Sequence, residues 1–237
     1  ANVLRRLQRV AAFHGAKPVF VCSSATIGNP RELAERLVEG SFEWVSRSGA
    51  PRGARHLLVY NPPVVDAALG IRASYLKSAC RLAGDLIDRK VQTLVFAQSR
   101  NAVELMMRYL RDHERKQGRD PEKVAGYRCG YLPNLRREIE HGLRDGGLRC
   151  VVATNALELG IDIGALDAVI LAGYPGSVAA LWQRAGRAGR RLAPSVAVLV
   201  TSSSPLDQFV ASQPDYLRHA GVEHGRVNPD NLEILLS

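Results

Sequence analysis

The sequence predicts an α/β fold in which short parallel strands alternate with helices. Short apolar runs follow one another along the chain, and longer stretches with helical spacing of apolar residues separate them, which is typical of βαβ units. Apolar residues make up 46% and charged residues 23% of the 237 residues, a globular composition that excludes a disordered chain. The length leaves room for one large domain or two modest ones.

The expected elements follow from these runs. Strands are predicted over Val19–Cys22, Leu57–Tyr60, Thr93–Ala97, Val124–Cys129, Cys150–Thr154, Ala168–Leu171 and Val196–Thr201. Helices are predicted over Val3–Phe13, Arg31–Val38, Arg72–Arg89, Asn101–Gln117, Leu135–Arg144, Val178–Ala188 and Pro205–Val210. Pro30 suits the first turn of the second helix, and Ser99 can cap the helix that follows Thr93–Ala97.

The stretch 46–66 is rich in glycine and proline, which is usual for a connection between domains. Only one strand and two helices precede it, too little to bury a core alone. We therefore expect residues 1–45 to end an incomplete domain, 46–70 to be a linker, 71–212 to form a complete α/β domain and 213–237 to begin a further region. Residues 46–54 are predicted to act as a hinge, with a rigid surface loop as the alternative.

The charge balance favours a nucleic-acid or nucleotide partner. The net charge is +9, and only five of the 32 cationic residues are lysines. The planar guanidinium of arginine suits bidentate contact with phosphate. A GC-rich coding genome would give the same bias, so for any single arginine a solvated surface position remains the alternative.

No apolar run is long enough to span a bilayer and no N-terminal stretch resembles a secretion signal, so we expect a cytoplasmic protein. The four cysteines, Cys22, Cys80, Cys129 and Cys150, form no C-x-x-C pair, and three of them lie in apolar or strand-like surroundings that favour a buried, reduced thiol. Neither a metal site nor a disulfide framework is predicted from them.

The strongest local pattern is the run from Gln183 to Arg190. Arg184, Arg187 and Arg190 recur at every third residue with glycines between them, and we expect no buried apolar residue in this stretch. Glycines let a phosphate approach the backbone, although each costs a helix roughly 1 kcal/mol. The pattern predicts an arginine finger that places positive charge on a transferring γ-phosphate. The alternative is a solvated basic end of a helix.

A second pattern lies between Val151 and Gly164. An apolar strand leads into Thr154 and Asn155, at the carboxyl edge of the predicted sheet, where α/β folds bind ligands. Gly160 and Asp162 follow in an apolar stretch, where an isolated carboxylate needs a partner. A turn capped by Asp162 is an equally good interpretation.

Three weaker patterns have the same character. Thr93–Arg100 ends in polar residues at the start of a helix, Cys22–Thr26 ends the first predicted strand, and Tyr127–Pro133 contains Gly130. Each alone carries little weight because strand ends are commonly polar. Their order along the chain is specific.

In this order the patterns resemble the motifs of the superfamily 2 DEAD/DEAH-box helicases, which have two RecA-like domains. Ser24–Thr26 resembles motif III, Leu94–Arg100 motif IV, Val152–Gly164 motif V and Gln183–Arg190 motif VI. The amino-acid sequences of segments 153–164 and 171–176 are most similar to those of DNA-repair helicases of the mitomycin-repair type, which have fungal relatives among RecQ-like enzymes. The resemblance covers residues 17–236. It implies a RecA-like parallel sheet with helices on both faces, a P-loop NTPase fold, preceded by part of a first RecA-like domain.

The resemblance also implies roles for the motif residues. Arg187 and Arg190 would reach the γ-phosphate of ATP with support from Gln183, and Gly160 and Asp162 would contact the ribose. Ser99, Arg100 and Thr154 would hold phosphates of a single DNA strand, joined by Asn155 and Gly130. Ser24 and Thr26 would couple hydrolysis in the first domain to strand binding.

The sequence contains no G-x-x-x-x-G-K-[ST] and no Asp-Glu pair. The resemblance places both motifs, and with them the Mg²⁺ ligands, outside this chain, so the chain alone is not expected to hydrolyse ATP. For the full-length protein it implies an ATP-dependent 3′-to-5′ DNA helicase that uses ATP and Mg²⁺, binds single-stranded and duplex DNA, and carries a C-terminal cysteine-rich domain. A non-catalytic nucleic-acid-binding module and an RNA helicase remain alternatives.

Overall fold

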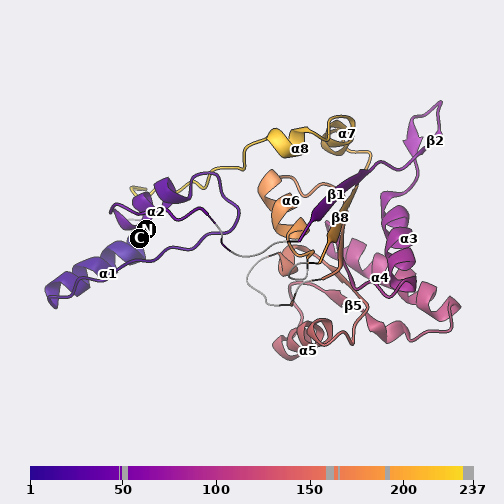
Figure 1. Ribbon diagram of the computed structural model, residues 1–237, viewed down its shortest axis with the longest axis horizontal. Helices are drawn as coiled ribbons and strands as arrows, with labels where there is room; N and C mark the ends of the chain where they lie inside the picture. Colours follow the sequence, from indigo (N-terminus) through magenta and orange to yellow (C-terminus); the bar gives the residue numbers. More distant parts are fainter. Residues whose placement is uncertain (48, 50–52, 159–162, 165, 190–192, 232–237) are drawn as a thin grey trace. The chain divides into compact units, whose positions relative to one another are not determined.

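The computed structural model describes residues 1–47, 49, 53–158, 163–164, 166–189 and 193–231 (Figure 1). The chain divides into two compact units, one formed by residues 1–49 together with 221–237 and the other by residues 50–220. The expected hinge at 46–54 falls partly outside the described residues, and its role stays a prediction.

The larger unit is built on a six-stranded parallel sheet with strand order β1-β8-β7-β4-β6-β5. Its strands are β1 (Arg55–Tyr60), β4 (Thr93–Phe96), β5 (Val124–Tyr127), β6 (Cys150–Ala153), β7 (Ala168–Ala172) and β8 (Ser195–Val200). Every pairing within this sheet is parallel, so all six carboxyl ends lie at one edge. The edge strand β1 matches the strand predicted from the apolar run Leu57–Tyr60. It lies within residues 46–70, the segment expected to be the linker.

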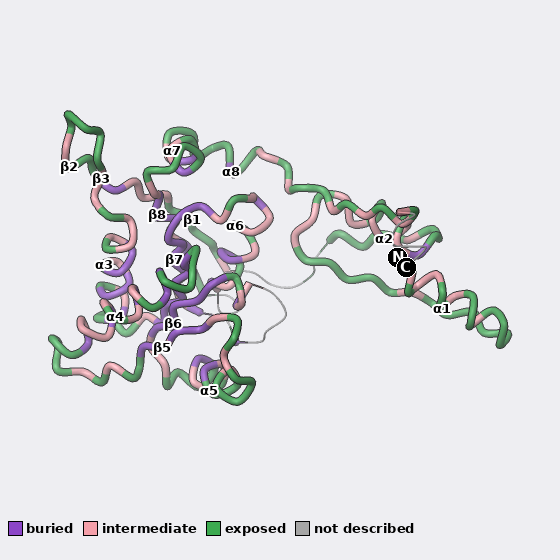
Figure 2. Tube along the Cα trace, turned by 180° about the vertical axis from the view of Figure 1, so that it is seen from behind, coloured by how far each residue is buried: buried purple, intermediate pink, exposed green. Residues whose placement is uncertain are grey.

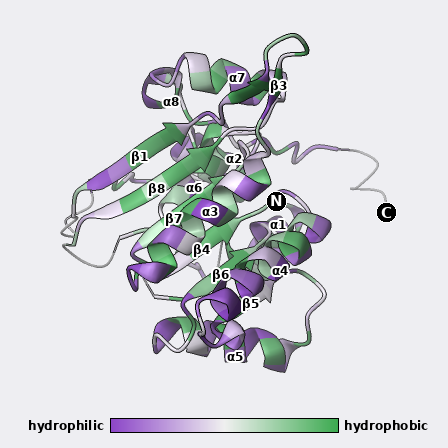
Figure 3. Cartoon of the chain, turned by 90° about the vertical axis from the view of Figure 1, so that its right-hand side faces the viewer, coloured by the Kyte–Doolittle hydropathy of each residue, from purple (hydrophilic) through white to green (hydrophobic). Residues whose placement is uncertain are grey.

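Helices cover both faces of the sheet. Helices α3 (Tyr75–Asp88) and α4 (Arg100–Lys116) pack against the face that carries Val95 and Val152. Helices α5 (Pro133–Arg144) and α6 (Val178–Ala185) pack against the face that carries Phe96 and Val151. Alternate residues of each inner strand therefore enter opposite cores, which is why these strands are apolar throughout. Figure 2 shows the burial concentrated on these strands, and Figure 3 shows their hydrophobic character.

Shorter elements complete this unit. They are the antiparallel pair β2 (Val64–Asp66) and β3 (Ile71–Arg72), the short 3-10 turns η1 (Pro121–Lys123) and η2 (Asn155–Leu157), and helices α7 (Pro205–Ser212) and α8 (Tyr216–His219). The hairpin accounts for one error of the sequence analysis, the expected start of a helix at Arg72. Helix α3 begins at Tyr75 instead, where the Ser74 hydroxyl accepts a hydrogen bond from the Lys77 amide at 3.4 Å.

The smaller unit contains helices α1 (Asn2–Phe13) and α2 (Pro30–Val38) and the extended segments 18–22 and 41–45. Residues 221–231 pack against it. The Gly28 amide donates to the Glu223 carbonyl at 3.0 Å, and the Asn29 side chain exchanges two hydrogen bonds with the Gly225 backbone. Residues 221–231 therefore belong to this unit. The expectation that residues 213–237 begin a further region stays a prediction.

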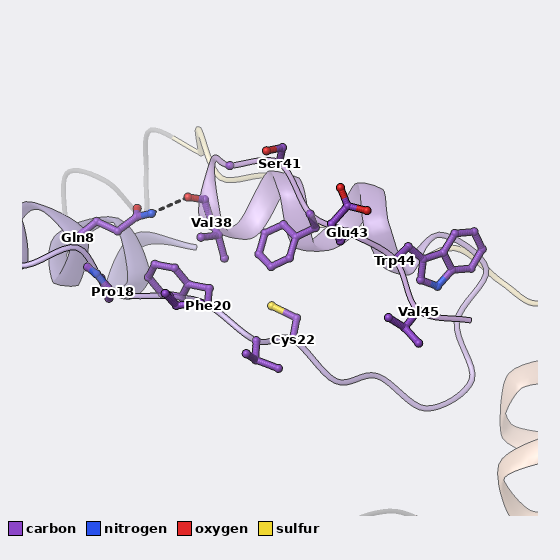
Figure 4. A pocket seen from close by; sticks show the side chains of 13 residues that line it. Gln8, Pro18, Phe20, Cys22, Val38, Ser41, Glu43, Trp44 and Val45 are labelled. Atoms are coloured by element: carbon purple, nitrogen blue, oxygen red, sulfur yellow. Dashed lines mark hydrogen bonds between the residues drawn. The ribbon is translucent and has the colours of Figure 1, made fainter. Parts of the chain in front are cut away.

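The predicted strand Val19–Cys22 is wrong for this structure. The segment is extended but pairs with no strand among the described residues, and Val19 and Val21 are 90% and 91% exposed. Figure 4 shows Phe20 and Cys22 across a cavity of about 620 Å³ from Trp44 and Val45 of the second extended segment. An apolar run becomes a strand only where a neighbouring backbone supplies hydrogen bonds.

Two of the four cysteines are buried, Cys80 and Cys150, whereas Cys22 and Cys129 are exposed. Three buried thiols were expected from the sequence. Burial raises the pKa of Cys80 to about 12 and also raises the pKa of Cys150. Both buried cysteines are therefore neutral thiols that act as small apolar side chains in the core.

Candidate functional site

Polar residues gather at the carboxyl edge of three adjacent strands of the larger unit. Strand β6 lies between β4 and β5 in the sheet. Ser99 and Arg100 follow β4, Thr154 and Asn155 follow β6, and Gly130 follows β5. The fold thus brings together all five residues that the resemblance assigns to a single nucleic-acid strand.

The end of β4 leads directly into α4. The Ala97 amide donates to the Ala153 carbonyl at 2.8 Å, and the Ser99 hydroxyl accepts a hydrogen bond from the Ala102 amide at 3.1 Å as the helix N-cap. Arg100 is the first residue of the helix, and both Ser99 and Arg100 are exposed. An exposed guanidinium at the positive end of a helix dipole attracts anions.

The ends of β6 and β5 offer fewer groups. Thr154 is 9% exposed, so only a small part of its surface is accessible to a ligand, and its backbone amide donates to the Tyr127 carbonyl at 3.2 Å. Asn155 is exposed at the start of η2. Gly130 is exposed with a φ of +100°, a backbone conformation that favours glycine.

The arginine-rich run begins on a helix and leaves it. Helix α6 starts at the cap Ser177, whose hydroxyl accepts from the Ala180 amide at 3.1 Å, and ends at Ala185 rather than at the expected Ala188. The following residues form a turn tied to the segment just before β7, because the Gly189 amide donates a hydrogen bond to the Leu166 carbonyl at 2.9 Å. Gly189 has a φ of +118°, so the helix cannot continue. Arg187 therefore lies on a loop.

Two arginines of this run bind one acidic residue, Glu158. Arg184 is 9% exposed, its Nε atom lies 3.0 Å from Oε2 of Glu158, and its guanidinium lies 5.4 Å from the centre of the Phe96 ring. Arg187 donates from Nη2 to the Glu158 carbonyl at 2.7 Å. Gln183 is half-buried on the same helix. The expectation of no buried apolar residue here is wrong, since Ala185 and Ala188 are buried.

Neither Glu158 nor the buried position of Arg184 was predicted from the sequence. The available signal was a carboxylate inside the apolar run from Leu157 onward, which needs a partner for the same reason as Asp162. Gly160, Asp162 and Arg190 lie outside the described residues. Ser24 and Thr26 belong to the smaller unit, where Ser24 is exposed and Thr26 is half-buried.

One cluster of the described residues has the composition of a metal site: Asp88, His113 and Glu114. The Arg119 guanidinium contacts both carboxylates, with Nη2 lying 2.7 Å from Oε1 of Glu114. Hydrogen bonds from His113 and then Arg119 lower the pKa of Asp88. A guanidinium already balances these carboxylates, so the cluster does not suit Mg²⁺, which prefers oxygen ligands and retained water.

Comparison with known proteins identifies the family to which this part of the chain belongs. Residues 75–191, which include the three strand ends and Arg187, match the family described as helicase conserved C-terminal domain. The chain belongs to the superfamily 2 helicases. The larger unit has the expected α/β fold, a parallel sheet with helices on both faces. The resemblance to superfamily 2 helicases is confirmed.

Relatives of this helicase segment are similar over nearly the whole chain. The uncharacterized ATP-dependent helicase YprA of Bacillus subtilis is 48% identical over 236 residues, which are 100% of this chain and 31% of YprA. The ATP-dependent helicase HRQ1 of Saccharomyces cerevisiae is 36% identical over 222 residues, 92% of this chain and 21% of HRQ1. A crystal structure of the DUF1998 helicase MrfA bound to DNA has a TM-score of 0.96 at 48% identity and covers 99% of this chain and 31% of MrfA.

The helicase segment therefore spans about a third or less of the length of these relatives. Among the described residues, no helix combines the length and apolar character that crossing a membrane requires.

Proposed function

We propose that the full-length protein is an ATP-dependent DNA helicase or translocase that moves 3′-to-5′ along a single strand. This chain would supply half of the strand track and the arginines that meet the nucleotide. The observation that carries the proposal is the grouping of four polar residues and Gly130 after three adjacent strands, at one edge of the sheet. The DNA-bound structure of MrfA, at 48% identity, supports DNA as the track.

The proposed track consists of Ser99, Arg100, Gly130, Thr154 and Asn155. Neighbouring strands lie about 4.8 Å apart, so the ends of β4, β6 and β5 extend over about 10 Å. Arg100 is the one cation of this set, and it would bind a phosphate together with the N-terminal amides of α4. Because these groups are backbone amides, small polar side chains and one guanidinium, they would hold the strand without reading its bases.

The proposed nucleotide contacts come from the arginine-rich run and the loop before it. Arg187 and Arg190 would stabilise charge on the transferring γ-phosphate with help from Gln183, and Gly160 and Asp162 would bind the ribose of ATP. The turn around Gly189 holds Arg187 off the helix, beside Glu158, which gives its guanidinium a defined direction. A structure of MrfA with DNA and AMPPNP, at 47% identity, supports nucleotide use.

The remaining parts of the motor would come from outside this chain. The phosphate-binding loop and the Mg²⁺ ligands would lie in a preceding segment, and a cysteine-rich domain would follow. Residues 1–45 would be the end of a first RecA-like domain, in which Ser24 and Thr26 couple hydrolysis to strand binding. The exposed apolar side chains of the extended segments, such as Val19 and Val45, support this, since further strands would cover them.

The test is ATP turnover by the full-length protein, measured with no nucleic acid, with single-stranded DNA and with RNA of equal length. We expect stimulation by DNA. Arg100→Ala should raise the DNA concentration needed for half-maximal stimulation, whereas Arg81→Ala, an exposed arginine on α3, should have no effect. Stimulation by RNA alone would favour an RNA helicase, and no stimulation by either would favour a non-catalytic binding module.

A further inference from the structure

We propose that Glu158 is a positioning residue that links the strand-binding turn at Asn155 to the arginine that meets the nucleotide. The inference rests on the proposed function, and it deepens that function by assigning roles to two residues, Glu158 and Arg184. Along the chain, both lie between Asn155 of the proposed track and Arg187.

Glu158 uses two different groups to hold two arginines. Its carboxylate pairs with Nε of Arg184 at 3.0 Å, and its backbone carbonyl accepts the Nη2 hydrogen bond of Arg187 at 2.7 Å. The two side chains of the ion pair are only 15% and 11% exposed, so solvent and salt screen the pair weakly. The directions of Arg184 and Arg187 therefore depend on where Glu158 lies.

The position of Glu158 is in turn fixed by the proposed track. Residues 155–157 form the 3-10 turn η2, which is closed by a 2.9 Å hydrogen bond from the Glu158 amide to the Asn155 carbonyl. Leu157 is fully buried and anchors this turn in the core. With a rise of about 2 Å per residue, Asn155 and Glu158 lie about 6 Å apart along the turn. If a bound DNA strand displaces Asn155, Glu158 should move with it, because a single hydrogen-bonded turn joins the two residues.

Arg184 connects a second strand end to the same pair. Its guanidinium lies 5.4 Å from the ring centre of Phe96, the last residue of β4 and three residues before Ser99. Arg184 therefore contacts the core beneath the end of β4 and the turn that follows β6. Because Arg184 is buried, we assign it a role in positioning the turn at Glu158. Contact with the phosphate is assigned to Arg187 alone of these two arginines.

These contacts give a specific mechanism for coupling. A strand bound at Asn155 sets the turn η2, the turn sets Glu158, and Glu158 sets Arg184 and Arg187. Without the ion pair, DNA would still bind and ATP would still enter, but Arg187 would be less well placed when the phosphate is transferred. Misplacement of a charge-stabilising group by about 1 Å can cost on the order of 100-fold in rate.

The experiment uses Glu158→Gln in the full-length protein, since glutamine keeps the size and the backbone carbonyl but removes the charge. We expect kcat of DNA-stimulated ATP turnover to fall about 10- to 100-fold, with KM for ATP and Kd for single-stranded DNA within about twofold of wild type. Arg184→Gln should give a similar loss, and the double variant should lose no more than the worse single variant, because both changes break one interaction. Glu122→Gln, which breaks the exposed ion pair with Arg111, is the matched control and should behave as wild type.

Three outcomes would overturn the inference while leaving the proposed function intact. They are full DNA-stimulated turnover in Glu158→Gln, a loss of DNA affinity that matches the loss of turnover, and additive losses in the double variant. An absence of DNA stimulation in the wild-type protein would instead refute the proposed function itself.

Discussion

Removal of Arg119 should destabilise the larger unit much more than removal of the nearby Arg115. Glu114 is 1% exposed, and Arg119 is bound to it through Nη2 at 2.7 Å and Nε at 3.1 Å. Loss of one partner of a buried ion pair costs about 3–5 kcal/mol, because the other charge stays buried without compensation. The Arg119 side chain is 37% exposed, so water can replace part of it, and we expect about 2–3 kcal/mol for Arg119→Ala.

The control arginine makes a contact of similar length on the surface. Arg115 lies 2.6 Å from Asp112, with side chains 56% and 50% exposed, and such a pair contributes at most about 1 kcal/mol. At roughly 2–4 °C per kcal/mol for a chain of this size, Arg119→Ala should lower Tm by about 4–12 °C. Arg115→Ala should lower it by less than about 4 °C. The measurement is thermal unfolding followed by circular dichroism at neutral pH.

A double variant tests whether the loss of stability comes from the unpaired, buried charge of Glu114. Adding Glu114→Gln to Arg119→Ala should recover part of the lost stability, because a neutral amide costs less to bury than an unpaired carboxylate. Equal shifts for Arg119→Ala and Arg115→Ala, or a further loss in the double variant, would refute the reasoning.

Three further outcomes are expected. Arg187→Ala in the full-length protein should lower DNA-stimulated ATP turnover on the order of 1,000-fold at unchanged Tm; wild-type turnover would contradict its assignment to the γ-phosphate. The isolated chain should bind single-stranded DNA weakly in fluorescence anisotropy, with affinity that falls as salt rises; Arg100→Ala should reduce the slope of log K against log salt by about 0.7, and an unchanged slope would exclude this contact. Because the pKa of Asp88 is lowered, its stabilisation is present above the ordinary value of about 3.9 and lost as pH falls through the lower native value. Asp88→Asn should therefore flatten the acid unfolding profile below about pH 4.

The sheet could be predicted because its inner strands are buried on both faces. Leu94 and Val95 enter opposite cores, and the same holds for Val151 and Val152, so these strands read as continuous apolar runs. The run at Val19 has the same appearance without a partner strand among the described residues. An apolar sequence indicates that a segment can form a β-strand, whereas strand formation also requires a neighbouring backbone that supplies hydrogen bonds.

The two parts of the candidate site, the residues at the strand ends and the pair Glu158 and Arg184, differ in how far the sequence predicts them. The polar residues after β4, β5 and β6 could be placed together from sequence because parallel strands bring their carboxyl ends to one edge. Glu158 could not be matched with Arg184, which lies 26 residues further along the chain and on another element. A carboxylate among apolar residues predicts a cationic partner but gives no choice among 27 arginines. The sequence predicted a helix over Val178–Ala188 that would contain both Arg184 and Arg187, but the helix ends at Ala185. One arginine is therefore buried in an ion pair and the other lies on a loop. Similar spacing in a sequence can therefore give two residues different tasks.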